Sequence, residues 1–298
     1  MNTKNNQDMP ARGWSASGRK KITNIKKLNG IAKQIRQNLM KSLIRAQSGH
    51  SAGSLDMADV FTALYFGSVL KYDPRRPNWR ERDRVILSAG HICPVLYATL
   101  AEAKYFPKRE LWNLRKLGSA LQGHPHFGEL PGVENTSGPL GQGVSYAVGV
   151  AYAIRYLQKS NEHVYLISTD GEQQEGQVWE AVMFAGKHKL PNLTMIIDRN
   201  NIQIDGNTED IIPLEPLAKK YEAFGWKTLE VDGHNIADII NACNKAKAII
   251  EKPVCIIAHT ISGKGVKFME GNFEWHGKPP KGGEAIEAMR LLGVKSGI

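Results

Sequence analysis

Two segments decide the fold, namely VYLISTDGE at residues 164–172 and LTMIIDRNNI at residues 193–202. Each begins with an apolar run and ends in polar and small residues. Between them, apolar side chains recur at helical spacing at Val178, Val182 and Ala185. The pattern predicts a strand, a crossover helix and a second strand, and a crossover of this length makes the two strands parallel.

Asp170 and Asn200 each come directly after one of these predicted strands. In an open parallel sheet, ligands bind beyond the carboxyl ends of the strands. Carboxylate and amide oxygens are hard donors, which suit Mg²⁺ or Ca²⁺. Asp and Asn are also common in ordinary turns. Their pairing across a single strand-helix-strand unit favours a metal site over two unrelated turns.

The composition is typical of a globular α/β protein, with 298 residues, 42% hydrophobic and 23% charged. No apolar run is long enough to span a bilayer, and the first residues lack the apolar core of a secretory signal. We therefore expect a cytoplasmic protein without a membrane partner. The cysteines, Cys93, Cys243 and Cys255, are too widely spaced for a disulfide framework or a zinc site.

The formal net charge is +10, which is compatible with anionic substrates, nucleic acid or an anionic membrane. The charges are dispersed, and no basic stripe is interleaved with aromatic residues. Nucleic acid is therefore not the partner that we expect.

Residues 1–21 are predicted to form a flexible basic tail, and residues 22–298 a single domain. The predicted parallel strands are 85–88, 164–167, 193–197, 228–231 and 254–258. The predicted helices are 22–47, 55–70, 94–103, 108–117, 144–157, 178–185, 213–224, 236–250 and 282–292. This order indicates an α/β fold with a mostly parallel central sheet and helices on both faces.

A long loop at residues 118–138 leads into the glycine-rich turn GPLGQG at residues 138–143. A loop of this length inside a compact domain is usually functional. A glycine-rich turn that opens a helix can bind an anion through free backbone N–H groups. It can equally serve close packing, and the turn alone leaves both possibilities open.

Several histidines stand in loops flanked by glycine. His91 follows the strand at residues 85–88, and His50, His124 and His276 lie in other loops. Histidine can donate and accept a proton near neutral pH. Together with a metal and a glycine-rich helix start, these residues indicate a cradle for a diphosphate beside acid–base groups.

These motifs resemble those of the transketolase family. TDGE at residues 169–172, followed thirty positions after its aspartate by Asn200, is similar to the family's thiamine diphosphate motif. The further matches, in family order, are SGH 48–50, SAGH 88–91, GHP 123–125, LPGVE 130–134, GPLGQG 138–143 and HG 276–277. The resemblance covers roughly residues 25–280 and implies a thiamine-diphosphate-binding fold.

The resemblance also implies roles for individual residues. Asp170, Asn200 and the main-chain oxygen of Ile202 would hold Mg²⁺ or Ca²⁺, which anchors thiamine diphosphate. His50, His124 and His276 would handle protons on the sugar, and Glu175 would link the cofactor sites at the interface between protomers. The cofactor-binding residues would be His91, Gly138, Pro139, Leu140, Gly141, Asp170, Gly171, Glu172, Asn200 and His276.

The implied reaction, part of carbohydrate metabolism such as the pentose phosphate pathway, moves a two-carbon ketol unit between sugar phosphates, from a ketose to an aldose. This chain ends where the pyrimidine-binding and C-terminal domains of the family would begin, and the glutamate that activates the cofactor ring belongs to them. The resemblance therefore implies the N-terminal subunit of a split transketolase. Its partner would be a C-terminal subunit, in a heterotetramer with two copies of each chain.

Two departures from the family pattern stand out. Thr169 replaces the usual first glycine of the motif, and Ser51-Ala52-Gly53-Ser54 replaces the frequent Pro-Gly-Ala-Pro after His50. Two alternative functions are a subunit of another thiamine diphosphate enzyme, such as a 2-oxo acid dehydrogenase component, and a phosphate-binding module without catalysis. The first does not account for the stretch at residues 123–143 or the loop at residues 274–277. The second gives no reason to keep metal ligands.

Overall fold

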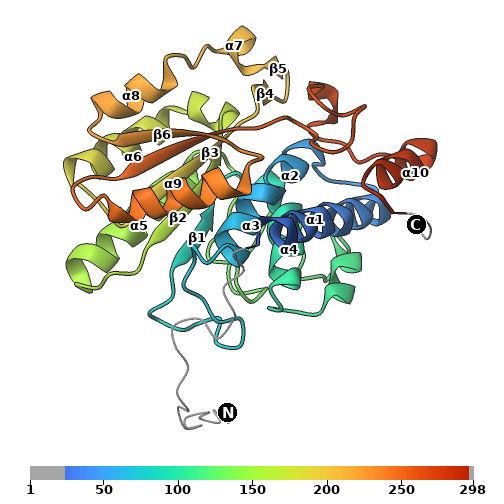
Figure 1. Cartoon of the computed structure of the whole chain (residues 1–298), viewed down its shortest axis with the longest axis horizontal. Helices are drawn as coiled ribbons and strands as arrows, with labels where there is room; N and C mark the ends of the chain where they lie inside the picture. The colour runs from blue at the N-terminus through green and yellow to red at the C-terminus, as the bar shows by residue number, and fades with distance from the viewer. Residues whose placement is uncertain (1–23, 295–298) are drawn as a thin grey trace.

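A single sheet of five parallel strands forms the centre of the molecule in the computed structural model, which describes residues 24–294 (Figure 1). The strands lie in the order β1-β2-β3-β7-β6. They are β1 (Arg84–Leu87), β2 (Val164–Thr169), β3 (Leu193–Arg199), β6 (Lys227–Asp232) and β7 (Val254–His259). The predicted strands and their parallel pairing are confirmed.

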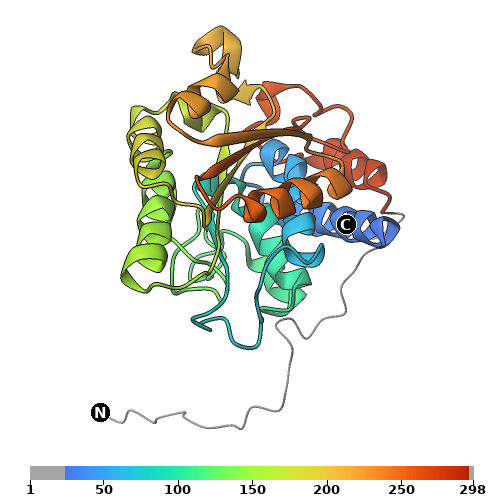
Figure 2. The same ribbon diagram turned by 60° about the vertical axis from the view of Figure 1, so that its left-hand side comes forward.

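Apolar side chains at alternate strand positions belong to two separate hydrophobic cores, one on each face of the sheet. Ile167 and Ile196 belong to the first core, while Leu166 and Met195 belong to the second. The first core is covered by α1 (Ile25–Ala46), α3 (Ala58–Phe66), α4 (Cys93–Glu102) and α9 (Ile236–Ala248). The second is covered by α5 (Gln142–Tyr152), α6 (Gly176–Lys187) and α8 (Leu217–Ala223). Figure 2 shows α5 and α6 on one side of the sheet and α1 and α9 on the other. The predicted coverage of both faces is confirmed.

Helix α1 illustrates how the sequence determines an element. The side chain of Asn24 caps the helix by accepting a hydrogen bond from the backbone N–H of Lys27 at 3.2 Å. Leu28, Ile35 and Leu39 recur at helical spacing and are completely buried. The helix ends at Ala46, because Gln47 adopts a left-handed conformation.

Three predicted helices differ in kind from the structure, and the helix predicted at residues 213–224 is shorter, since α8 begins only at Leu217. The helix predicted at residues 55–70 is two helices, α2 (Ala52–Asp56) and α3, with Met57 between them. The helix predicted at residues 108–117 is only a 3₁₀ segment, Lys108–Asn113, because Arg115 has a φ of +59° that no right-handed helix accommodates. The helix predicted at residues 144–157 is α5 followed by a π-helical turn, Ala153–Leu157.

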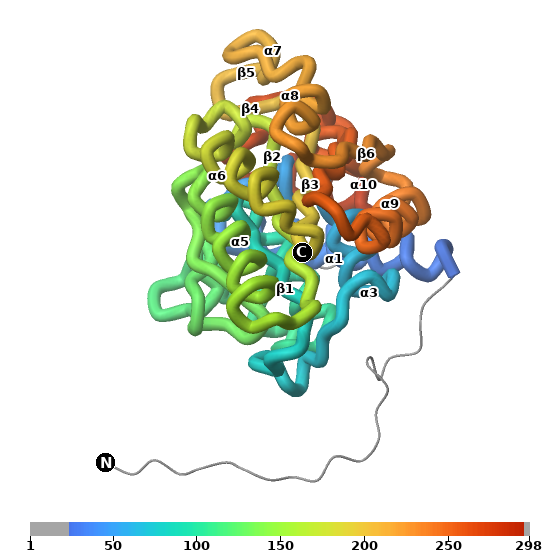
Figure 3. The backbone as a smooth tube through the Cα atoms, turned by 90° about the vertical axis from the view of Figure 1, so that its left-hand side faces the viewer, coloured from blue at the N-terminus to red at the C-terminus, as the bar shows by residue number. Residues whose placement is uncertain are grey.

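A small annex follows β3 and was not predicted. It comprises the antiparallel pair β4 (Ile202–Gln203) and β5 (Gly206–Asn207) and the helix α7 (Thr208–Ile211). Figure 3 shows these elements together at one end of the molecule, beyond the strand ends. The remaining elements are 3₁₀ turns at Gly90–Ile92, Gly171–Gln174 and Phe273–Trp275, and the helix α10 (Gly282–Leu291).

The predicted N-terminal tail, residues 1–21, lies outside the described residues. Within residues 24–294, no helix combines the length and the apolar character that crossing a membrane requires.

Candidate active site

A pocket of about 410 Å³ lies at the carboxyl ends of β2 and β3. It therefore occupies the edge where parallel sheets bind ligands. Its lining combines histidines and acidic residues with apolar side chains of the annex. The lining residues are His50, Gly53, His91, Gly138, Leu140, Thr169, Gly171, Glu172, Gln174, Glu175, Asn200, Ile202, Gln203, Ile204, Ile212 and His276.

Asp170 is completely buried at the end of β2 and is held by three donors. The N–H of Gly171 donates to its Oδ1 at 2.7 Å, and the N–H of Asn201 donates to its Oδ2 at 2.6 Å. The guanidinium of Arg199 donates to the same Oδ2 at 3.1 Å. Burial raises the pKa of Asp170 to about 6, although Arg199 and the two amides favour the charged form.

The side-chain amide of Asn200 is fixed in one orientation by two buried acids. Its Nδ2 donates to Asp56 at 3.0 Å and to Asp198 at 3.2 Å, whereas its Oδ1 accepts from the N–H of Ile202 at 2.9 Å. Burial raises the pKa of Asp198 to about 8 and that of Asp56 well above its ordinary value. Because both acids accept from the nitrogen, the oxygen of Asn200 faces the side of Ile202 and the pocket.

The residues present fit a hard cation. Asp170 offers a carboxylate, and Asn200 offers an oxygen whose direction is set by neighbouring acids. Across residues 24–294, no three His, Cys, Asp or Glu side chains are grouped as metal ligands, so a cation here would rely on amide and main-chain oxygens as well. The sequence did not predict the proximity of Arg199, which places a positive group beside Asp170.

The glycine-rich turn packs tightly against the strand ends. A Cβ on Gly143 would lie 2.5 Å from the Cα of Ser88, so α5 begins in close contact with the end of β1. Gly141 has a φ of +82°, and its N–H donates to the carboxylate of Glu172 at 2.6 Å. Close packing, one of the two interpretations left open by the sequence, therefore accounts for Gly141 and Gly143. Gly138 and Leu140 line the pocket, whereas Pro139 lies between them in the turn.

Glu172 connects the turn to two strand ends. Its completely buried carboxylate accepts hydrogen bonds from the hydroxyls of Ser88 and Ser168, both at 2.5 Å, in addition to the N–H of Gly141. Burial raises its pKa, and these donors oppose the shift. Glu172 thus borders the pocket, but its carboxylate is engaged in hydrogen bonds that connect the glycine-rich turn to the ends of β1 and β2.

The structure brings the four predicted histidines together. The ring centroid of His50 lies 5.2 Å from that of His91, 5.6 Å from that of His276 and 6.2 Å from that of His124. Burial lowers the pKa of His50 to about 4 and lowers the pKa of the other three as well. The Nδ1 of His50 is buried and, among the described residues, has no hydrogen-bond partner. The cluster thus combines neutral imidazoles with one buried nitrogen that lacks a hydrogen-bond partner within residues 24–294.

Sequence reasoning missed several residues around the pocket. The annex contributes Gln203, Ile204 and Ile212 to its wall. Asp56 and Arg199 were missed because their roles depend on contacts between distant segments. An arginine inside a buried strand run was the one available signal for Arg199, whose side chain is only 3% exposed. Glu175, which was predicted, does line the pocket.

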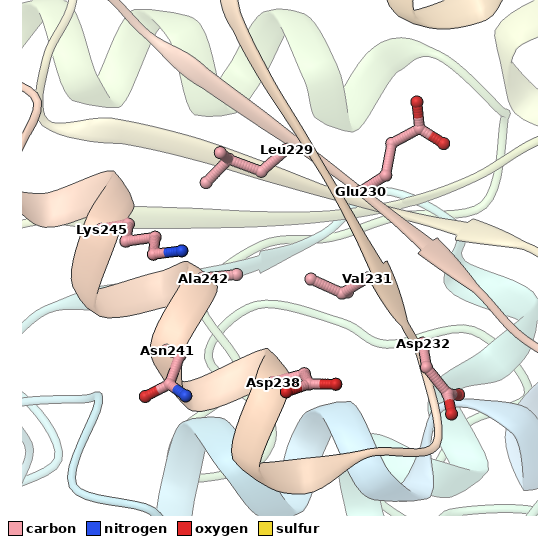
Figure 4. A pocket seen from close by; sticks show the side chains of 8 residues that line it. All are labelled: Leu229, Glu230, Val231, Asp232, Asp238, Asn241, Ala242 and Lys245. Atoms are coloured by element: carbon pink, nitrogen blue, oxygen red, sulfur yellow. The ribbon is translucent and has the colours of Figure 1, made fainter.

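A second hollow, of about 300 Å³, lies between the edge strand β6 and α9 (Figure 4). Val231 points toward Ala242 at its base, and Asp232, Asp238 and Lys245 surround it. This groove lacks the convergence of strand ends, glycine turn and histidines that marks the first pocket.

Comparisons with known proteins agree with this geometry. The family model described as "Transketolase, thiamine diphosphate binding domain" matches residues 28–296. The chain is 44% identical over 245 residues to the 6-deoxy-6-sulfo-D-fructose transketolase subunit SqwG of Clostridium sp. (strain MSTE9), covering 82% of this chain and 88% of that protein. It is 41% identical over 256 residues to an apulose-4-phosphate transketolase subunit of Phocaeicola vulgatus, covering 86% of this chain and 90% of that protein.

Solved structures give the same result. The crystal structure of transketolase from Campylobacter jejuni superposes with a TM-score of 0.85 at 36% sequence identity. The match covers 91% of this chain but only 43% of that one. The chain thus spans about two fifths of the length of that solved enzyme.

Proposed function

The chain belongs to the transketolase family, whose thiamine diphosphate-binding domain it forms, and we propose that it is the N-terminal subunit of a two-subunit transketolase. The observation that carries this proposal is the pocket itself, where Asn200, the glycine-rich turn and the histidine cluster meet beside Asp170. The relatives named as subunits are covered almost in full, which supports a partner chain with the remaining domains.

We further propose that Asp170, Asn200 and the main-chain oxygen of Ile202 hold Mg²⁺ or Ca²⁺. His91, His276, Gly171 and the pocket side of Glu172 would then border the diphosphate. The turn from Gly138 to Gly141, of which Gly138 and Leu140 line the pocket, would border the rings of the cofactor. When bound, thiamine diphosphate supplies an electron sink for breaking a carbon–carbon bond beside a carbonyl.

The remaining chemistry is proton transfer by this chain's histidines. A ketol transfer removes a proton from one sugar hydroxyl and returns one to the oxygen of the acceptor aldehyde. His50, His124 and His276 are neutral near pH 7, because burial lowers their pKa values, so each can accept a proton and later give it back.

We propose that the substrates carry an anionic group. We also propose that the protein acts in the cytoplasm. The two subunit relatives are named for a sulfonated and a phosphorylated sugar, which are both anionic. A chain with a formal net charge of +10 favours such substrates electrostatically.

The outer helices offer a surface for the partner. Tyr146 on α5 and Met183 and Phe184 on α6 are 47%, 56% and 43% exposed. Both helices begin at the pocket, α5 at the glycine turn and α6 directly after Glu175. A pyrimidine-binding chain on this face would therefore also reach the pocket, and two copies of each chain would form the heterotetramer.

Reconstitution tests the proposal. The purified chain should bind thiamine diphosphate only with Mg²⁺ present, measured by calorimetry, and should transfer ketol groups between sugar phosphates only with a pyrimidine-binding subunit. Transfer by this chain alone would exclude the split arrangement. Binding of phosphate without any dependence on Mg²⁺ and thiamine diphosphate would favour the non-catalytic module.

A further inference from the structure

Arg115 lies between the two loops that carry His50 and His124. Its Nη1 donates to the hydroxyl of Ser48 at 3.0 Å, and its Nη2 donates to the carbonyl of Gly123 at 3.4 Å. Ser48 stands two residues before His50, and Gly123 stands directly before His124. One guanidinium thus bonds to both segments just ahead of their histidines.

The glycine ahead of His124 makes room for this guanidinium. A Cβ on Gly123 would lie 2.8 Å from the Cζ of Arg115, and a Cβ on Gly49 would lie 3.4 Å from its Nε. Gly49 also has a φ of +123°, which side chains rarely adopt. The His124 loop therefore approaches the guanidinium more closely than a larger residue would allow, whereas a Cβ on Gly49 would clash with Leu43 at 2.6 Å and not with the guanidinium.

The backbone of Arg115 is itself fixed in an uncommon conformation. Its φ is +59°, and its N–H donates to the carbonyl of Leu121 at 2.8 Å, which closes a turn over residues 115–121. This turn is the reason that the helix predicted at residues 108–117 does not form. It directs the side chain back toward Gly123 instead of continuing along a helix.

We propose that Arg115 is a positioning residue that locks the His50 and His124 loops together and holds a fixed positive charge beside both imidazoles. The inference rests on the proposed function, in which these two rings exchange protons with sugar oxygens. Arg115 would thus act on both histidines, although among the described residues its hydrogen bonds reach neither the proposed metal ligands nor the glycine-rich turn.

The electrostatic surroundings support this role. Besides burial, the pKa of His50 is lowered by His276, Arg115 and His124. The pKa of His124, which lies exposed at the rim, is lowered by partial burial and by Arg115. The ring of His91 also faces His50. Protonation of either imidazole would place a second positive charge near the guanidinium, so Arg115 favours the neutral form of both rings.

Two substitutions separate geometry from charge. Arg115→Lys keeps the charge but loses the planar fork that reaches both loops. Arg115→Gln loses the charge and keeps a polar side chain. NMR titration of the histidine rings in the purified chain, with resonances assigned through His50→Gln and His124→Gln, measures the protonation of each ring without any partner or turnover.

We expect Arg115→Gln to move the titration midpoints of both rings upward. Arg115→Lys should leave the midpoints low but weaken the contacts between the two loops in nuclear Overhauser spectra. Arg45→Met, which removes an exposed arginine above Trp112, serves as the control and should change neither. Unchanged midpoints in Arg115→Gln, or equal shifts in Arg45→Met, would overturn the inference. If Arg115→Gln does not fold, Arg115→Lys still tests both parts of the proposal. Histidine titration midpoints that rise in Arg115→Lys would overturn the role of the charge. Contacts between the two loops that persist in Arg115→Lys would overturn the positioning role.

The result stands apart from the proposed function. A chain that never transfers ketol groups could still show the predicted titration, and an active complex could still contain histidines indifferent to Arg115.

Discussion

The guanidinium of Arg199 lies 3.1 Å from the carboxylate of Asp170, and both side chains are almost completely buried. Arg199 also reaches Glu209 of the annex at 2.6 Å and Glu215, shortly after the annex, at 3.1 Å. One cation therefore joins the proposed metal ligand to the segment that carries part of the pocket wall. A divalent ion at Asp170 would share that carboxylate with Arg199.

Arg199→Met should destabilise the free chain by about 3–5 kcal/mol, because it leaves a buried carboxylate without its partner. Mg²⁺ with thiamine diphosphate should restore much of this loss, since the metal supplies the missing positive charge. Thermal unfolding with and without both ligands measures the difference. We expect the two ligands to raise the unfolding temperature of the variant more than that of the parent chain.

Arg82→Met is the matched control for this experiment. Arg82 forms a largely buried pair with Glu134 at 2.6 Å, away from Asp170. Its loss should lower stability to the same degree with and without ligands. If the ligands raised the unfolding temperature of both variants equally, Arg199 would have no link to the metal site.

Two glycines of α5 should respond in opposite ways to alanine. At Gly143 a Cβ meets the backbone of Ser88 at 2.5 Å, so Gly143→Ala should cost about 1–3 kcal/mol and weaken binding of Mg²⁺ and thiamine diphosphate. At Gly149 a Cβ meets nothing within 4 Å, so Gly149→Ala should gain up to about 1 kcal/mol through helix propensity. Urea denaturation measures the change in stability of each variant, and calorimetry measures its binding of Mg²⁺ and thiamine diphosphate. A tolerated Gly143→Ala would contradict the close packing at the turn.

The sequence predicted the parts of the site that depend on short segments. Asp170 and Asn200 could be placed because an apolar run, a turn and a helix pattern occur around each of them. The annex could not be predicted in this way, because β4, β5 and α7 span only two to four residues each and show no periodicity. Arg199 contacts this segment through Thr208 and Glu209, and these side-chain contacts leave no periodic pattern in the sequence.

The error at residues 108–117 has a different cause. The segment has good helix formers, but Arg115 adopts a left-handed conformation to reach Ser48 and Gly123. Tertiary contacts thus overrode a local preference. Where the sequence interpretation failed, the structure places a residue beside the histidine cluster.

His163 should make the fold sensitive to acid. It is buried, its Nε2 lies 2.7 Å from the hydroxyl of Thr194, and burial lowers its pKa to about 3. Between pH 6.5 and pH 3 His163 binds a proton in the unfolded chain but not in the folded chain, so the contribution of this group to stability falls as the pH decreases. This single group should contribute a slope of about 1.4 kcal/mol per pH unit.

His163→Gln should remove that slope, which urea denaturation at several pH values between about 4 and 6 would measure. His126→Gln, at an exposed loop position, should leave the slope as it is. If the two variants showed the same pH dependence as the parent chain, the acid sensitivity would have to come from other groups.

Thr169→Gly tests whether the departure from the family motif affects the site. Thr169 ends β2 opposite Asp198, and its carbonyl accepts a hydrogen bond from the Nε2 of Gln173 at 2.9 Å. Because glycine preserves that carbonyl, calorimetry should find binding of Mg²⁺ and thiamine diphosphate unchanged. Stability should fall by about 1 kcal/mol, since glycine is more flexible in the unfolded chain. Thr228→Gly on β6, which is also buried, should lose stability similarly. A change in cofactor affinity confined to Thr169→Gly would show that the threonine side chain contacts the ligand, and the substitution would then be part of what distinguishes this chain within its family.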